Sequence, residues 1–123
     1  MMTHKIKINV NQLLGIQLGV ATGILVVGSP PVQAGDKLAL KCPRGDTMVW
    51  VDVVPSHIKT CPLYALTHDD LVTIHQRLCF TREKDIENLL RQINIEQERN
   101  GEELLTRAAT VTIITFPRQK RQI

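Results

Sequence analysis

The sequence predicts a small α+β domain, in which a small antiparallel sheet packs on two helices and follows an N-terminal hydrophobic helix. Three observations predict this class. Residues 37–54 alternate between apolar and polar side chains around a turn, residues 67–99 carry apolar side chains at helical spacing, and residues 110–116 are mostly β-branched. The length of 123 residues supports one domain. It excludes an (α/β) barrel, which needs about 250 residues.

The first element is a hydrophobic helix within residues 1–34. The segment Leu13–Val27 is almost wholly apolar, and no charged residue occurs between Lys7 and Asp36. Two lysines precede this run, and Val32-Gln33-Ala34 resembles the site at which signal peptides are cut. We therefore predict a signal peptide over residues 1–34, which would export the remainder of the chain.

The alternative for this segment is an uncleaved N-terminal membrane anchor over residues 10–28. Gly15, Gly19 and Gly23 would line one face of such a helix with small residues and allow another helix to approach closely. The uncharged stretch is long enough to cross a bilayer core, which takes about 20 residues. Both alternatives place the C-terminal domain outside the cytoplasm.

The first part of the sheet is a predicted hairpin. Strand 37–42 alternates, the turn 43–46 contains Pro and Gly, and strand 47–54 returns before Pro55. The returning strand has Val49, Val51 and Val53 on one face and Trp50 on the other. Trp50 is a candidate partner contact if only the valine face is covered, and a core residue if both faces are.

Two helices follow a predicted loop at residues 56–66. The first begins at the N-cap Thr67, carries an apolar stripe that includes His75, and ends near Cys79-Phe80. The second begins after the N-cap Thr81 and covers residues 82–99, or 82–108 if it continues through Asn100-Gly101.

The C-terminal strand is predicted over residues 110–116, because a β-branched run before a proline is typical of a buried strand. It completes a single exported domain over residues 35–117. A basic tail at 118–123 follows, and Arg118-Gln119-Lys120-Arg121 within it resembles a furin-type processing site. We favour the alternative, a solvated basic tail that frays as termini do.

The three cysteines all lie in the predicted exported domain, where an oxidising compartment would favour a disulfide. Only 3% of the residues are aromatic, so the core is thin and a covalent link would help. Of the three pairings we favour Cys42–Cys61, which closes a loop of about 20 residues and contributes about 3 kcal/mol in the chain-entropy model. Cys79 is expected on a helix, as the leftover thiol.

Catalytic and metal-binding patterns are sparse. The chain has no G-x-S-x-G elbow, no H-E-x-x-H and no phosphate-binding glycine loop, so we expect no enzyme, no catalytic residue and no cofactor. His57 and Cys61 repeat the spacing of His75 and Cys79, and these four residues are the candidate ligands if a metal is bound. His75 and Cys79 at i,i+4 on a helix are also the candidates for an activated thiol.

The charge balance bears on partners. The chain has 15 Lys and Arg against 12 Asp and Glu, but the predicted exported part has 13 against 12. A net charge of +1 predicts no nucleic-acid partner. We expect a protein partner, and the leftover cysteine and the long helix both offer a route to a homodimer.

These observations lead to one hypothesis with two alternatives. The hypothesis is a small exported protein, periplasmic or secreted, that is non-enzymatic, has an interaction or structural role and is stabilised by a disulfide. The first alternative is an accessory subunit of a membrane complex, anchored by residues 10–28. The second is a metal- or thiol-dependent activity at His75 and Cys79.

Overall fold

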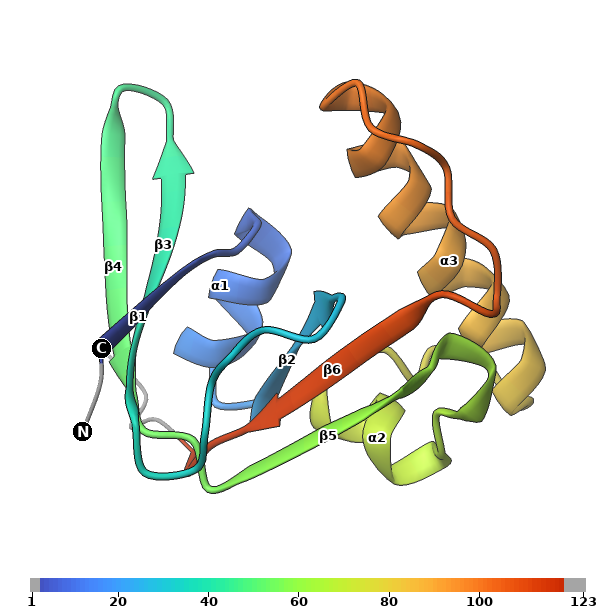
Figure 1. Ribbon diagram of the computed structural model, residues 1–123, viewed down its shortest axis with the longest axis horizontal. Helices are drawn as coiled ribbons and strands as arrows, with labels where there is room; N and C mark the ends of the chain where they lie inside the picture. The colour runs from blue at the N-terminus through green and yellow to red at the C-terminus, as the bar shows by residue number, and fades with distance from the viewer. Residues whose placement is uncertain (1–2, 119–123) are drawn as a thin grey trace.

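The computed structural model describes residues 3–118, which form a small mixed α+β domain with two three-stranded sheets and three α-helices. Figure 1 shows their arrangement. The strands are β1 (Thr3–Lys7), β2 (Gly23–Val27), β3 (Lys37–Arg44), β4 (Thr47–Val53), β5 (His57–Pro62) and β6 (Thr110–Thr115). The helices are α1 (Val10–Gln17), α2 (His68–Thr73), α3 (Arg82–Arg99) and the short 3₁₀ helix η1 (Leu63–Ala65).

The strands pair differently from the prediction. The first sheet has the order β1-β3-β4, with β1 parallel to β3 and β3 antiparallel to β4. The second sheet has the order β2-β6-β5 and is antiparallel throughout. The α+β class, the β3–β4 hairpin and the C-terminal strand are therefore confirmed. The single antiparallel sheet is wrong, because β6 pairs with β2 and β5 and makes no pair with the hairpin.

Helix α1 lies between the two sheets, and α2 and α3 lie on the other side of the second sheet (Figure 1). One apolar core joins Leu13 and Ile16 of α1 to Leu40 of the first sheet and Ile114 of the second. A second core packs α2 and α3 against the second sheet. Its main members are Leu63, Leu66, Leu71, Ile86, Leu89, Val111 and Ile113. Strand β6 therefore contributes to both cores, with Val111 and Ile113 on one face and Ile114 on the other.

Residues 3–27 belong to the folded domain, which corrects the prediction of a signal peptide. They supply β1 to the first sheet, β2 to the second and α1 to the core between them. The apolar run is broken at Gly19, whose φ of 72° ends α1. The amide of Gly19 donates to the carbonyl of Ile16, and that of Val20 to the carbonyl of Gly15, which is the hydrogen-bond pattern of a Schellman cap.

Helix α1 has eight residues. Within residues 3–118, no helix is both long enough and apolar enough to span a membrane, so the predicted transmembrane helix over 10–28 is wrong.

The predicted loop at 56–66 is also corrected, since most of it forms β5 and η1. Pro62 misled the prediction. It stands at the last position of an edge strand, where a residue without an N–H is tolerated.

The predicted helix starts are confirmed, and one of the two ends is wrong. The side chain of Thr67 caps α2 and that of Thr81 caps α3. Helix α2 stops at Thr73, well before the predicted end near Cys79-Phe80. Helix α3 ends at Arg99 as predicted, and the longer alternative to residue 108 is wrong, because Gly101 has a φ of 71° and closes a second Schellman cap.

The predicted disulfide is absent, because all three cysteines are free. Cys42 is buried in the core between the sheets, Cys61 lies on β5 in the other sheet, and Cys79 precedes α3. The predicted pairing of Cys42 with Cys61 assumed that residues 56–66 form a loop and that this loop keeps Cys61 close to the hairpin. Strand β5 instead pairs with β6, which takes Cys61 into the second sheet.

Candidate functional site

The outward face of the first sheet gathers basic side chains from β1 and β3, and Trp50 lies beside them on β4. On β3 the residues Leu38, Leu40 and Cys42 are buried against α1, so the alternate residues face solvent. We call this surface the lysine face. Its charged and large apolar members are Lys5, Lys7, Lys37, Lys41, Met48, Trp50 and Asp52. The register places Lys7, Lys41 and Trp50 in one row across the sheet.

Trp50 lies on the edge strand β4 and is 49% exposed. The Nζ atom of Lys5 lies 6.0 Å from the centroid of its ring, at the limit of a cation–π contact. Val49 and Val51, on the opposite face of β4, pack against the core. Trp50 was predicted to be either an exposed residue or a core residue, and in the structure it is exposed. Whether it contacts a partner stays a prediction.

The lysine face also changes the charge argument. Lys5 and Lys7 were predicted to lie in a removable segment, and their charge was therefore discounted. In the structure both lie on β1. The lysine face therefore carries four lysines and one carboxylate, that of Asp52. The lysine face is accordingly more positive than it would be without Lys5 and Lys7, whose charge the prediction had left out.

A cleft lies between α1 and α3, and we call it the amide cleft. Its inner part is a cavity of about 210 Å³ and its outer part is a groove of about 680 Å³. The two parts share five lining residues, namely Asn9, Asn11, Gln12, Gln92 and Glu96. Lys7 and Pro43 also line the groove, so it adjoins the lysine face. The cleft was not predictable from the sequence, because its side chains come from segments about 80 residues apart.

The candidate metal and thiol residues do not assemble. Within the described residues, no group of three or more His, Cys, Asp or Glu side chains could hold a metal ion. His57 and Cys61 lie on β5, where the nearest partner of the His57 ring is the hydroxyl of Ser56 at 3.2 Å. Burial is the main cause that raises the pKa of the Cys61 thiol, which disfavours the thiolate that acts as nucleophile.

His75 and Cys79 do not share a helix face, because α2 has already ended. His75 has a φ of 56° and stands in the left-handed position after the helix. The amide of Cys79 donates to Asp85 Oδ1, and its Sγ accepts from Asn88 Nδ2 at 3.7 Å. The i,i+4 geometry on which an activated thiol depended is therefore absent.

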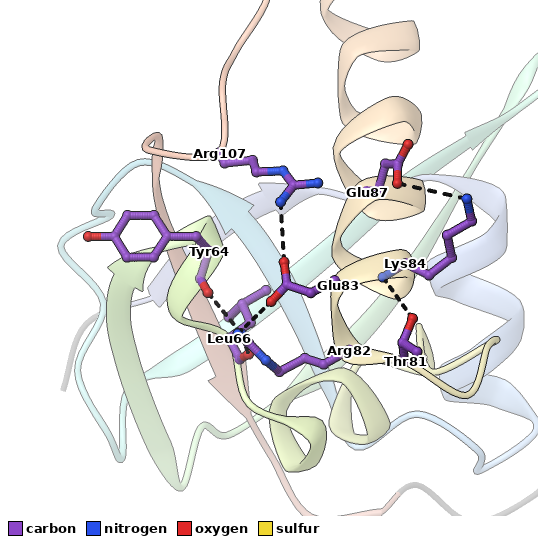
Figure 2. Close-up of polar contacts among 8 residues, drawn as sticks. All are labelled: Tyr64, Leu66, Thr81, Arg82, Glu83, Lys84, Glu87 and Arg107. Carbon is purple, nitrogen blue, oxygen red and sulfur yellow. Dashed lines mark hydrogen bonds and ion pairs between the residues drawn. The ribbon is translucent and has the colours of Figure 1, made fainter.

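A polar cluster at the start of α3 is structural. Figure 2 shows Arg82 reaching from the first turn of α3 to η1, where its Nη1 donates to the carbonyls of Tyr64 and Leu66, both at 2.8 Å. Its Nη2 pairs with Glu83 at 2.8 Å, and Glu83 also accepts from Arg107 at 3.2 Å (Figure 2). These contacts hold η1 and the segment before β6 against α3. The side chains of Arg82, Glu83 and Arg107 are all engaged in them.

The pair of Lys59 and Asp70 makes the fold sensitive to acid. Burial raises the pKa of Asp70, but hydrogen bonds from Lys59 Nζ at 2.6 Å and from Thr67 outweigh it, so the pKa lies below its ordinary value. A carboxyl with a lowered pKa stabilises the fold above its unfolded-state pKa and loses that contribution as the pH falls through the folded value.

We therefore expect the substitution Asp70→Asn to cost more stability at pH 7 than at pH 3. Urea denaturation of both proteins at the two pH values measures the difference. An equal cost at both would contradict a stabilising role for the Asp70 carboxylate.

Comparison with known proteins bears on the fold. No family model matches the chain, and no curated protein matches it. A solved structure described as the crystal structure of hypothetical protein PH0355 is similar, with a TM-score of 0.60 and 12% sequence identity over 94% of this chain and 100% of that chain. At this identity the likeness shows a shared fold.

Proposed function

We propose that this protein binds single-stranded nucleic acid on the lysine face. The observation that carries the proposal is the half-exposed Trp50 of β4 beside four lysines from β1 and β3. Proteins that bind single strands combine a positive surface for the phosphates with an aromatic side chain on which a base stacks. An open sheet face presents both without closing around the ligand.

The shape of the surface fits this ligand. Lys41 lies directly opposite Trp50 on the neighbouring strand, with Lys7 beyond it on β1. Strands are separated by about 4.8 Å, so the row of Lys7, Lys41 and Trp50 spans about 10 Å. That distance accommodates one base on the indole and the adjoining phosphates on the two ammonium groups. The expectation of no nucleic acid rested on the loss of Lys5 and Lys7, and this premise no longer holds.

Trp50 is the sole tryptophan, so its fluorescence reports directly on this face. We expect oligothymidylate to quench that fluorescence, with an affinity that falls as salt is added. Three to four phosphate contacts predict a slope of log K against log[salt] of about −2 to −3 for a single strand. Quenching that is absent, or that does not depend on salt, would refute the proposal.

We expect Trp50→Ala to weaken binding of labelled oligothymidylate by about 5- to 150-fold, because stacking of one base contributes about 1–3 kcal/mol. Fluorescence anisotropy of the labelled strand measures this loss. Tyr64→Ala is the matched control, since Tyr64 is an aromatic residue of similar exposure on η1, away from the first sheet. Polyglutamate that competes as well as the oligonucleotide would instead indicate an acidic protein partner.

A further inference from the structure

The inner part of the amide cleft has the features of a small-molecule site. This cavity of about 210 Å³ has apolar side chains from three elements, among them Ile24 of β2, Ile74 at the end of α2 and Leu89 of α3. We propose that it binds a small, largely apolar molecule whose polar end carries N–H donors. The volume is sufficient, since an engineered apolar cavity of about 150 Å³ binds benzene.

Gln76 supplies the polar recognition. It lines the cavity, and its Oε1 is buried without a hydrogen-bond partner. Buried polar atoms are nearly always paired, so an orphan acceptor beside a cavity indicates a missing donor. The amide of Gln12, by contrast, is already committed to Asn9 and to the carbonyl of Leu25.

The backbone holds Gln76 at this position by an unusual helix end. The amide of His75 donates to the carbonyl of Val72 at 3.0 Å, and that of Gln76 to the carbonyl of Leu71 at 2.7 Å. This is the same Schellman pattern that ends α1 and α3. The other two caps have Gly19 and Gly101 at the left-handed position, whereas this one has His75. A non-glycine residue there costs free energy, and such strain often accompanies binding sites.

The charges around the cavity select the sign of the ligand. Of the described residues that line it, none is a lysine or an arginine. Glu96 is the one carboxylate among them, and its Oε1 pairs with Arg99 Nη1 at 3.1 Å. An anion would therefore find no lysine or arginine among the described residues of the cavity, where His75 is the one histidine. A neutral or cationic group with N–H donors would find the Gln76 oxygen and the second oxygen of Glu96. This disfavours carboxylate ligands and favours amides and amidines.

Three probes with the same ring test this inference, namely benzamide, benzamidine and benzoate. In ¹H–¹⁵N correlation spectra we expect benzamide and benzamidine to shift the amide signals of residues 24, 76 and 89 in a saturable manner. Benzoate lacks N–H donors and is anionic, so we expect it to bind at least tenfold more weakly. Equal binding of benzoate, shifts confined to the first sheet, or no saturable shift by any probe would overturn the proposal.

The variant Gln76→Leu separates recognition from simple burial. Because it removes an unpaired buried acceptor and keeps the backbone hydrogen bond to Leu71, we expect it to fold with undiminished stability. We expect its affinity for benzamide to fall about tenfold, while Gln33→Leu, at an exposed glutamine that does not line the cleft, leaves that affinity unchanged. A Gln76→Leu protein that binds benzamide as the wild type does would refute the assigned role of Gln76. Oligothymidylate binding serves as a separate readout, since the cavity proposal does not depend on it.

Discussion

Asp85→Ala is expected to reduce the free energy of unfolding by about 3 kcal/mol, which is a large share of the stability of a small domain. Asp85 is fully buried in the first turn of α3. Its Oδ1 accepts the backbone amides of Leu78 at 3.0 Å and Cys79 at 2.6 Å. Each hydrogen bond to a charged group contributes about 1.5–3 kcal/mol, and alanine would leave both donors without a partner.

The expected loss is smaller than two full hydrogen bonds, because the other carboxylate oxygen is itself unsatisfied. Asp85 Oδ2 is buried with no partner, and alanine removes that cost. Asp85→Asn is the matched control, since its side-chain oxygen can accept both amides. We expect it to retain most of the stability in urea denaturation. Equal losses for the two variants would show that the hydrogen bonds to residues 78 and 79 contribute little.

Hydrogen exchange provides a second readout of the same prediction. The segment between α2 and α3 contains Leu78 and Phe80, which are 61% and 99% exposed, so apolar packing cannot hold it. In the alanine variant we expect the amides of Leu78 and Cys79 to exchange much faster. We expect the amides of β6 still to exchange only through global unfolding. Unchanged protection at these two amides would contradict the anchoring role of Asp85.

Local features were predicted well from the sequence, because they depend on neighbouring residues. The β3–β4 turn has Gly45 at a φ of 59°, and the side chains of Thr67 and Thr81 cap the helices that they precede. Pairing between distant strands was not predicted. Strand β5 became the partner of β6 across about 50 residues, and no local pattern in residues 57–62 specifies that choice.

The apolar run Leu13–Val27 shows why hydropathy alone misled the prediction. A nearly uniform apolar segment is required by a removable signal and by a membrane anchor. It is equally required by a helix followed by a strand when both are buried. What distinguishes them is the break at Gly19, where the chain reverses between α1 and β2. This error propagated to the charge argument, because Lys5 and Lys7 were discounted with the segment. Half of the lysines on the lysine face were therefore missed.

The candidate sites were only partly predictable for a related reason. Trp50 was recognised, but its exposure depends on α1 covering only one face of the first sheet. The orphan oxygen of Gln76 and the buried carboxylate of Asp85 were missed, since an acid in the first turn of a helix also fits a simple dipole interaction. Burial decides between these roles, and burial is a property of the whole fold.

Gly23→Ala is expected to destabilise the protein by about 2–3 kcal/mol, because the added methyl group has no space. A Cβ at this position would lie 2.7 Å from Cγ2 of Thr73 and 2.8 Å from the carbonyl oxygen of Ile114. The second contact is with the backbone of the central strand β6, which cannot move without disturbing its pairing with β5. Thermal or urea denaturation measures the loss.

Gly15→Ala is the matched control, and it also separates two explanations of the glycine spacing. A Cβ at Gly15 would meet only the Cβ of Ala21, at 3.1 Å, and alanine is favoured over glycine in a helix interior by about 1 kcal/mol. We therefore expect Gly15→Ala to change stability by less than 1 kcal/mol. A face of small residues that packs one helix on another requires Gly15 and Gly23 to act alike, since both would lie on that face. A large loss of stability for Gly23→Ala with little change for Gly15→Ala is the result expected if the two glycines have separate roles. Gly23 allows close contact between β2, α2 and β6, whereas Gly15 lies within α1.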